Sequence, residues 1–444
     1  MEIFRHLPKD APLSIEEIKE ALIESLHGKE LKKVLLIPPD ITRYHSNAGM
    51  ITNTYYHLLK DQAIVDILPA LGTHDPMTKE EVKDMYGDIP FERFIIHRWR
   101  TDIVKVGEVP ASYVKSITEG LWESGVTMEL NKIILDPSYD LIISIGQVVP
   151  HEVIGMANHA KNIFVGCGGK STIHQSHMIG AVYGMERMMG KDHTPVRKVL
   201  DYAWEHFIKE LPLIFVLTVT TAPNNQIQTH GLFIGDTRRV LEEAIEVSQR
   251  KNINFVKTGI KKCIVYLDPK EFRSTWLGNK AIYRTRMAVA DGGDLIVIAP
   301  GIMKFGEDET IDHLIKKYGY VGRDQVLELF KHNEDLQKNM SAAAHLIHSS
   351  SEGRFKITYA VKDIDQESIR RVNFSAMDYE EAIRQFPIHT FSPGYNTLSN
   401  GEEIYFIPNP ALGLWINEET FYNQDKVGKT SWKIINRLFE FLIY

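Results

Sequence analysis

The chain has 444 residues, of which 43% are apolar and 25% are charged, and its formal net charge is -7. This length predicts two or three domains, and the composition is that of an ordinary globular protein. The acidic balance argues against the clustered basic face that nucleic-acid binding needs, so we expect no nucleic-acid partner. The longest apolar run, at residues 211–219, is too short to span a bilayer.

The N-terminal sequence is charged and interrupted by prolines, unlike a signal peptide. The two cysteines, Cys167 and Cys263, provide no disulfide framework. We therefore expect a cytoplasmic protein with no membrane partner.

Strand and helix patterns alternate along the first 270 residues. Apolar runs predict strands at 32–39, 63–72, 91–99, 139–146, 213–220, 227–236 and 262–267, with a small hairpin and another strand within 102–132. Helical patterns occupy 50–61, 171–189, 195–211 and 237–251, and one further helix follows Asp75 or Thr78 as its N-cap. This alternation predicts a mostly parallel sheet with helices on both faces.

A second α/β unit is predicted to begin near residue 275, so we place the domain boundary at about 270. Helices are predicted at 275–291, 308–318, 323–332 and 335–350, and strands at 292–300, 354–361, 372–377 and 403–409. An amphipathic helix at 432–444 is expected to pack back across the domains or into a subunit contact. The predicted fold class is therefore α/β, with two α/β domains at 1–270 and 271–444.

One stretch, Pro150 to His177, concentrates ionisable side chains between a buried strand and the start of a helix. It contains His151, His159, His174 and His177, together with Lys161 and Lys170. Two earlier strand ends carry Asp40 with Arg43, and His74. Because the carboxyl ends of parallel strands converge on one crevice, we expect these groups to meet there.

Several familiar motifs are absent from this stretch. The eight-residue spacing of His151 and His159 excludes the zinc-protease motif, and the upstream glycine of a Walker A loop is missing. The turn Gly168–Gly169–Lys170 is either a phosphate site or a tight turn with a surface lysine. One or two of the histidines could hold nickel, zinc or iron; alternatively, His174 and His177 form a hydrogen-bonded pair on one helix face.

Taken together, PPDITR, ALGTH, and His151 followed by Lys161 and His177 resemble lactate racemase and its relatives, the nickel-pincer-nucleotide enzymes. The resemblance covers most of the chain and is strongest through residue 236. It implies two α/β domains with the active site in the cleft between them, the second domain closing over the substrate. It also implies a nickel ion held by pyridinium-3,5-bisthiocarboxylic acid mononucleotide, covalently attached to a lysine.

Positions in the family motifs imply a role for each residue. Lys161 would be the tether, with Lys170 as the alternative, and His177 the nickel ligand. His74 and His151 would be the acid/base pair. The predicted cofactor-binding residues are Lys161, Asp40, Thr42, Arg43, Gly168, Gly169 and Lys170. Proteins that make the cofactor are implied partners, and the oligomeric state stays open.

The implied reaction is racemisation or epimerisation at C2 of a 2-hydroxy acid, by hydride transfer through a 2-keto acid. Departures in the second domain suggest a substrate other than lactate. Its candidate substrate residues are Gln337, Lys338, His389, Tyr395 and Asn396. Two other functions use the same residues: a zinc- or iron-dependent hydrolase or dehydratase, and a binding protein that performs no chemistry.

Overall fold

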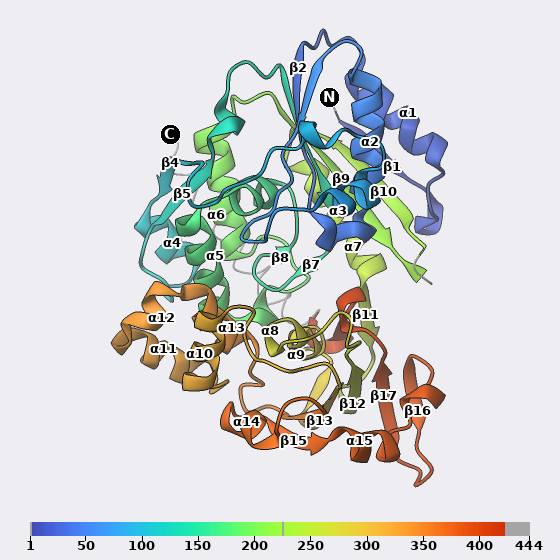
Figure 1. The fold of residues 1–444 in the computed structure, drawn as a ribbon, viewed down its shortest axis with the longest axis vertical. Coiled ribbons are helices and arrows are strands. Elements are labelled where there is room, and N and C mark those ends of the chain that lie inside the picture. Colours follow the sequence, from blue (N-terminus) through green and yellow to red (C-terminus); the bar gives the residue numbers. More distant parts are fainter. Residues whose placement is uncertain (1, 224–225, 422–444) are drawn as a thin grey trace. The chain divides into compact units, whose positions relative to one another are not determined.

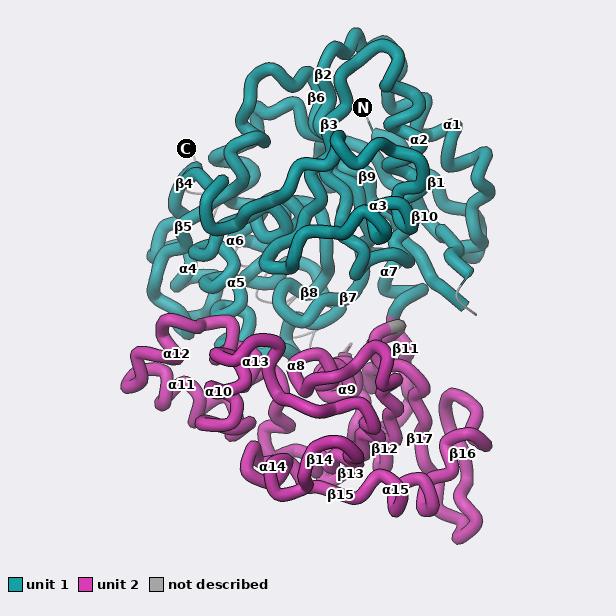
Figure 2. The backbone as a smooth tube through the Cα atoms, viewed as in Figure 1, with its two compact units in different colours: residues 1–252 teal, residues 253–444 magenta. Residues whose placement is uncertain are grey.

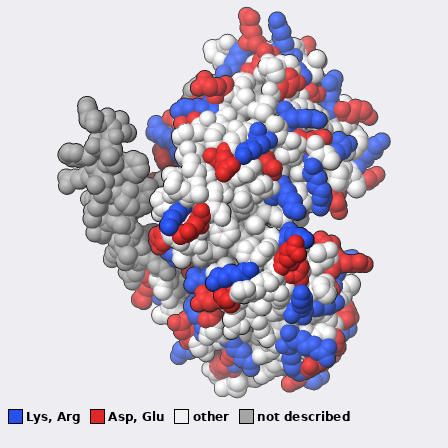
Figure 3. Space-filling model, turned by 90° about the vertical axis from the view of Figure 1, so that its left-hand side faces the viewer, with Lys and Arg blue, Asp and Glu red and all other residues white. Residues whose placement is uncertain are grey.

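The structure is a computed structural model that describes residues 2–223 and 226–421 (Figure 1). The chain divides into two compact units, residues 1–252 and 253–444 (Figure 2). The predicted helix at 432–444 lies outside the described residues. No described helix has both the length and the apolar character needed to cross a membrane. On the face drawn in Figure 3, acidic and basic side chains are interspersed rather than gathered by sign.

The boundary between the units lies earlier than the predicted residue 270. The strand predicted at 262–267 falls within the predicted first domain, but in the structure it belongs to the second unit. This strand, β12 (Ile260–Tyr266), pairs in parallel with β13 (Val289–Ala299) and β17 (Glu403–Ile407). It is therefore an internal strand of the second unit's sheet, and its apolar sequence alone does not say which sheet it joins.

The first unit is built on a six-stranded sheet of order β1-β10-β9-β6-β2-β3. Its strands are β1 (Ile3–His6), β2 (Lys33–Ile37), β3 (Ile64–Ile67), β6 (Leu141–Gln147), β9 (Leu213–Thr221) and β10 (Gln228–Gly235). The four strands β9, β6, β2 and β3 run parallel, β10 pairs antiparallel with β9, and β1 pairs antiparallel with β10. The predicted mostly parallel sheet is confirmed, and the strands predicted at 213–220 and 227–236 are β9 and β10.

Both faces of this sheet are buried, which explains the continuous apolar runs of its strands. Side chains alternate between the faces: Leu35 and Ile37 enter one core, and Val34 and Leu36 enter the other. The second core is closed by α1 (Ile15–Leu26), α2 (Ala48–Leu59) and α3 (Lys79–Tyr86), and the first by α6 (Pro195–Ala203) and α7 (Arg239–Asn252). Helices therefore cover both faces, as predicted.

Local signals fix several helix ends. Thr78, one of two predicted caps, begins α3 and forms a capping box with Glu81. The helix predicted to reach residue 189 is α5 (Lys170–Tyr183), and it ends earlier. It stops because Gly184 adopts a φ of +102°, outside the helical range.

Two predicted segments differ from the structure. Residues 91–99 are not a strand: Phe91–Arg93 forms a 3₁₀ turn, and an isolated bridge joins Phe94 to Ile67. Within 102–132, β4 (Ile103–Val109) and β5 (Val126–Asn131) form a separate antiparallel pair, with α4 (Ala111–Ile117) between them.

The second unit contains a six-stranded sheet of order β15-β14-β13-β12-β17-β16, parallel except for β16. The strands not yet given are β11 (Ile253–Val256), β14 (Lys356–Val361), β15 (Ser375–Asp378), β16 (Gly394–Thr397) and β18 (Leu414–Asn417). The helices are α8 (Thr275–Gly278), α9 (Lys280–Tyr283), α10 (Glu309–Tyr318), α11 (Arg323–His332), α12 (Glu334–Lys338), α13 (Met340–His348), α14 (Gln366–Arg371) and α15 (Tyr379–Gln385). The long helix predicted at 275–291 is instead two single turns, because Gly278 and Asn279, both weak helix formers, interrupt it.

Candidate active site

The predicted site residues of the first unit follow neighbouring parallel strands at one edge of the sheet. Asp40 follows β2, His74 follows β3, and His151 follows β6 in the short strand β7 (Pro150–His151). The chain passes from β2 to β3 on one side, whereas β6 lies on the other side of β2. Such a reversal of strand order opens a crevice at the carboxyl ends of the strands, where ligands of α/β proteins bind.

Asp40 and His74 are in direct contact. His74 Nδ1 lies 2.6 Å from Asp40 Oδ2, and the backbone N–H of Thr42 donates to Asp40 Oδ1 at 3.1 Å. Burial raises the pKa of the Asp40 carboxyl, but the hydrogen bonds from His74 and Thr42 outweigh burial and hold that pKa below its usual value. The ionised carboxylate keeps the proton of neutral His74 on Nδ1, so Nε2 carries the lone pair. The His74 side chain is 57% exposed.

The His151 ring differs from His74 in its burial and in which ring nitrogen carries the proton. It lies in a two-strand hairpin with β8 (Gly155–Met156), and its side chain is buried. The backbone N–H of Val153 donates to His151 Nδ1 at 3.1 Å. A neutral ring that accepts at Nδ1 carries its proton on Nε2. His151 is therefore a proton donor at Nε2, whereas His74 is an acceptor there.

Lys161 is held against the ends of three strands by the π-helix Asn162–Gly166 that follows it. The side-chain amide of Asn162 donates to Ile37 O, at the end of β2, and to Ser144 Oγ in β6, both at 3.0 Å. The backbone N–H of Gly72, in the connection after β3, donates to Gly166 O at 2.7 Å. Residues far apart in the sequence thus fix the position of Lys161.

The surroundings of Lys161 make its ammonium easier to deprotonate. Burial, reinforced by the positive charge of Arg43, lowers its pKa to about 8, although Glu152 and Asp40 act in the opposite direction. These charges act on Lys161 because they are close to it. Asp40 and Arg43 therefore lie within electrostatic range of Lys161.

His177 lies on α5, and its Nδ1–H donates to Ile173 O at 2.6 Å. That hydrogen bond leaves the lone pair on Nε2, the tautomer that a metal ligand needs. Burial lowers the pKa of the ring and the charge of Lys161 lowers it further, whereas the hydrogen bond to Ile173 and the charge of Glu152 partly oppose this shift. The Lys161 ammonium is therefore within electrostatic range of the His177 ring.

Glu152 is a residue of this site that sequence reasoning missed. It influences both Lys161 and His177, and its Oε2 lies 3.9 Å from His151 Nδ1. The only signal in the sequence was its position directly after His151.

The Gly168–Lys170 turn is already engaged by protein groups. Glu129 Oε2 accepts the N–H of Ser171 at 3.0 Å, so a carboxylate lies at the start of α5. His97 Nε2 donates to Gly168 O at 3.1 Å, and Lys170 is exposed. A phosphate at this turn would have to compete with Glu129 for the helix N-terminus.

The other two histidines of the stretch lie apart from this chemistry. His159 is fully buried and stacks on Phe215, with ring centroids 3.8 Å apart. Its pKa is well below the ordinary value because of burial and the charges of Arg197 and Arg238. Burial, with Lys170 and His177, lowers the pKa of His174 to about 4.

The candidate residues of the second unit make contacts typical of structural surface residues. Gln337 Nε2 donates to Phe330 O at 2.8 Å, and Lys338 pairs with Glu334 at 2.7 Å on exposed α12. Tyr395 is 49% exposed, and the side chain of Asn396 donates to Ser392 O at 2.7 Å. His389 lies in the 3₁₀ turn Ile388–Thr390.

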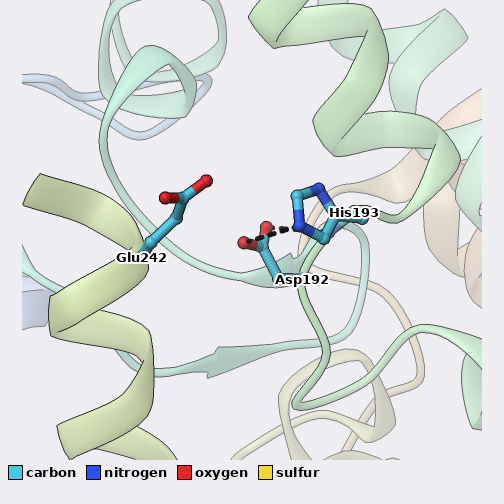
Figure 4. A group of neighbouring side chains, drawn as sticks. All are labelled: Asp192, His193 and Glu242. Carbon is cyan, nitrogen blue, oxygen red and sulfur yellow. Dashed lines mark hydrogen bonds and ion pairs between the residues drawn. The ribbon is translucent and has the colours of Figure 1, made fainter. Parts of the chain in front are cut away.

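A second group of metal-ligand types lies elsewhere in the first unit (Figure 4). Asp192, His193 and Glu242 bring one donor atom each within 4.8 Å of the others. However, Arg238 forms ion pairs with both Asp192 and Glu242. A cation there would meet a guanidinium that already neutralises the carboxylates, which disfavours a metal at this group.

The chain is similar in sequence to known lactate racemases. Residues 11–189, which include His74, His151, Lys161 and His177, match the model of the lactate racemase N-terminal domain. A lactate racemase from Lactiplantibacillus plantarum is 24% identical over 261 residues, which are 56% of this chain and 52% of that protein. A lactate racemase from Thermoanaerobacterium thermosaccharolyticum is 26% identical over 339 residues, which are 70% of this chain and 73% of that protein. The match to the Lactiplantibacillus plantarum protein thus spans about half of that protein's length.

Two solved structures share the fold. A crystal structure of a Thermotoga maritima protein covers 92% of this chain and 99% of its own, with a TM-score of 0.77 and 23% identity. The lactate racemase apoprotein of Thermoanaerobacterium thermosaccharolyticum covers 93% of this chain and 96% of its own, with a TM-score of 0.68 and 17% identity. These likenesses confirm the predicted two α/β domains. The first unit is thus similar to the lactate racemase N-terminal domain over residues 11–189.

Proposed function

We propose that this protein is a racemase or epimerase that inverts C2 of a 2-hydroxy acid with a nickel-pincer nucleotide. The observation that carries the proposal is the opposite protonation of His74 and His151. Asp40 leaves His74 with a lone pair on Nε2, whereas the N–H of Val153 leaves His151 with a proton there. Inversion of a hydroxy acid needs one group that removes the hydroxyl proton and another that returns a proton.

The residues present fit the proposed cofactor. His177 offers Nε2 as a nitrogen ligand, which suits nickel. Lys161 has a pKa near 8 and can supply the neutral amine that an amide tether requires. Arg43 acts electrostatically on Lys161, so it is close enough to pair with an anionic group of the nucleotide or with the substrate carboxylate.

When bound, the cofactor supplies a carbon that accepts a hydride and gives it back. The protein's own task is to move protons and to hold the substrate. His74 Nε2 takes the hydroxyl proton as C2 becomes planar, and the Asp40 carboxylate stabilises the resulting imidazolium. His151, once it has taken up a second proton, donates the Nε2 proton of its imidazolium to the substrate oxygen as C2 becomes tetrahedral again on its other face, and the ring returns to its neutral form. An imidazole can release or take up a proton near neutral pH, so the two roles can exchange in the reverse direction.

A hydrogen-retention assay tests this function. Both configurations of C2-deuterated 2-hydroxy acids are incubated in ordinary water with protein from cells that make the cofactor. We expect inversion with deuterium retained at C2, because hydride returns to the carbon it left. Inversion with deuterium lost to solvent would contradict hydride transfer, and no inversion of any acid would contradict the racemase proposal.

A matched pair of histidine variants ties the activity to the site. His74→Gln should lower kcat at least about 100-fold, because a positioned acid or base contributes that much. His57→Gln is the control, since His57, on α2, pairs with Asp88 and has no part in the proposed chemistry. An equal loss in both variants would show that the effect is general rather than catalytic.

A further inference from the structure

The segment that leads into Lys161 has an unusual backbone. Asn158 and His159 adopt φ angles of +73° and +57°, and neither is a glycine. L-residues rarely adopt this left-handed conformation, and two in succession need support from their surroundings. Part of it is local, because the N–H of His159 donates to Asn158 Oδ1 at 2.8 Å.

The rest of the support comes from the start of α6, which packs beside α5 (Figure 1). Thr194 Oγ1 donates to Ile154 O at 2.7 Å. Arg197 Nη2 donates to Met156 O at 2.7 Å and to Asn158 O at 3.1 Å. Alternate carbonyls of residues 154–158 are thus held by two side chains of one helix.

Arg197 is itself fixed in place. Its side chain is 1% exposed, and its Nη1 lies 3.8 Å from Asp201 Oδ1, one turn along α6. Arg238 Nε donates to Asp201 at 3.0 Å and also pairs with Asp192. Burial lowers the pKa of the Arg197 guanidinium to about 10, so it stays charged at neutral pH. A rigid cation with several donors is well suited to gather backbone carbonyls.

We propose that Arg197 is the positioning residue for Lys161: by holding the carbonyls of Met156 and Asn158, it fixes the left-handed turn that presents the lysine. The importance of Lys161 rests on the proposed function, whereas the positioning is a property of the chain itself. Arg197 touches neither substrate nor cofactor in this proposal and acts through the backbone. Its charge also favours the neutral amine of Lys161.

The test compares Arg197→Lys and Arg197→Met with the control Arg250→Met. Arg250 also makes two hydrogen bonds, at 2.8 and 2.9 Å, but both go to Asp10. The first readout is hydrogen exchange of the amides of residues 154–161 in the chain without cofactor. We expect exchange at least about tenfold faster in both Arg197 variants and unchanged in Arg250→Met, because a local opening is no longer opposed.

The second readout is the pH midpoint of Lys161 acetylation, followed by peptide mass spectrometry. Arg197→Met should move the midpoint upward, because a nearby positive charge is lost. Arg197→Lys should keep it near the wild-type value while exchange still rises, since one ammonium cannot reproduce the fixed contacts to two carbonyls. If Arg197→Met does not fold, Arg197→Lys alone decides the geometry.

The third readout is the fraction of Lys161 that carries a covalent adduct after expression with the cofactor-making proteins. It should fall in both Arg197 variants and stay at the wild-type level in Arg250→Met. Folded Arg197→Lys with wild-type exchange at 154–161, or with wild-type adduct, would overturn the proposal. If wild-type protein has no adduct at all, the proposed function fails, while exchange and acetylation still test the role of Arg197.

Discussion

At the scale of single residues, the contact with Asp40 fixes the proton position of His74, the proposed base. Asp40→Asn keeps the size of the side chain but removes the charge that stabilises an imidazolium and fixes the proton on Nδ1. We expect kcat to fall about 100-fold or more, with KM little changed.

Asp88→Asn is the matched control for this change, because Asp88 also pairs with a histidine, His57, at 2.9 Å. Steady-state kinetics in both directions is the measurement. A fall in kcat that Asp88→Asn reproduces would contradict a specific role for the Asp40–His74 contact.

In the chain without cofactor, the Lys161 side chain should lower the free energy of unfolding. Burial and Arg43 lower its pKa to about 8, so below that pH the folded chain holds an unfavourable ammonium. Lys161→Met should therefore raise the free energy of unfolding by about 1–2 kcal/mol near neutral pH, after allowance for solvent screening.

The pH dependence of that gain has a definite sign. Between about pH 8 and its ordinary pKa of 10.5, the unfolded chain binds more protons at Lys161 than the folded chain, so wild-type stability rises with pH. The advantage of Lys161→Met should shrink over that window in urea titrations. Lys83→Met, at an exposed position of α3, should change little at any pH. A destabilised Lys161→Met at neutral pH would contradict this account.

At the scale of elements, the Asn162 side chain joins β2 and β6 to the π-helix Asn162–Gly166, which directly follows Lys161. Asn162→Ala leaves Ile37 O and Ser144 Oγ without their donor and should cost about 1–3 kcal/mol. Asn53→Ala is the control, since its amide also donates to two acceptors, Tyr86 O and Asp88 Oδ1. Both variants should unfold at lower urea, but only Asn162→Ala should reduce the adduct on Lys161. Equal adduct in the two would contradict a positioning role for Asn162.

The elements also show what the sequence could predict about the site. Asp40, His74 and His151 were expected to converge because they follow buried strands, and parallel strands present their carboxyl ends together. The π-helix after Lys161 and the left-handed pair Asn158–His159 were not expected, because partners distant in the chain impose both. Glu152 was missed for the same reason: its neighbours are set by packing, not by spacing.

At the scale of the whole molecule, the boundary between the units gives a prediction about fragments. Residues 1–252 contain both cores of the first sheet, so this fragment should unfold cooperatively by circular dichroism and remain monomeric by size exclusion.

Residues 1–270 would carry β11 and β12 without their partners β13, β17 and β18. Unpaired strand edges promote association, so this longer fragment should be less soluble than the shorter one. The opposite order of solubility would place the boundary near the predicted residue 270 instead.

The central claim is that Lys161 and His177 together hold a nickel-pincer nucleotide. The most direct measurement combines nickel analysis with peptide mass spectrometry on protein from cells that make the cofactor. We expect about one nickel per chain and a covalent adduct on Lys161, lost in Lys161→Arg; His177→Ala should keep the adduct while losing nickel. Zinc or iron without an adduct, or an adduct on Lys170 instead, would contradict the account.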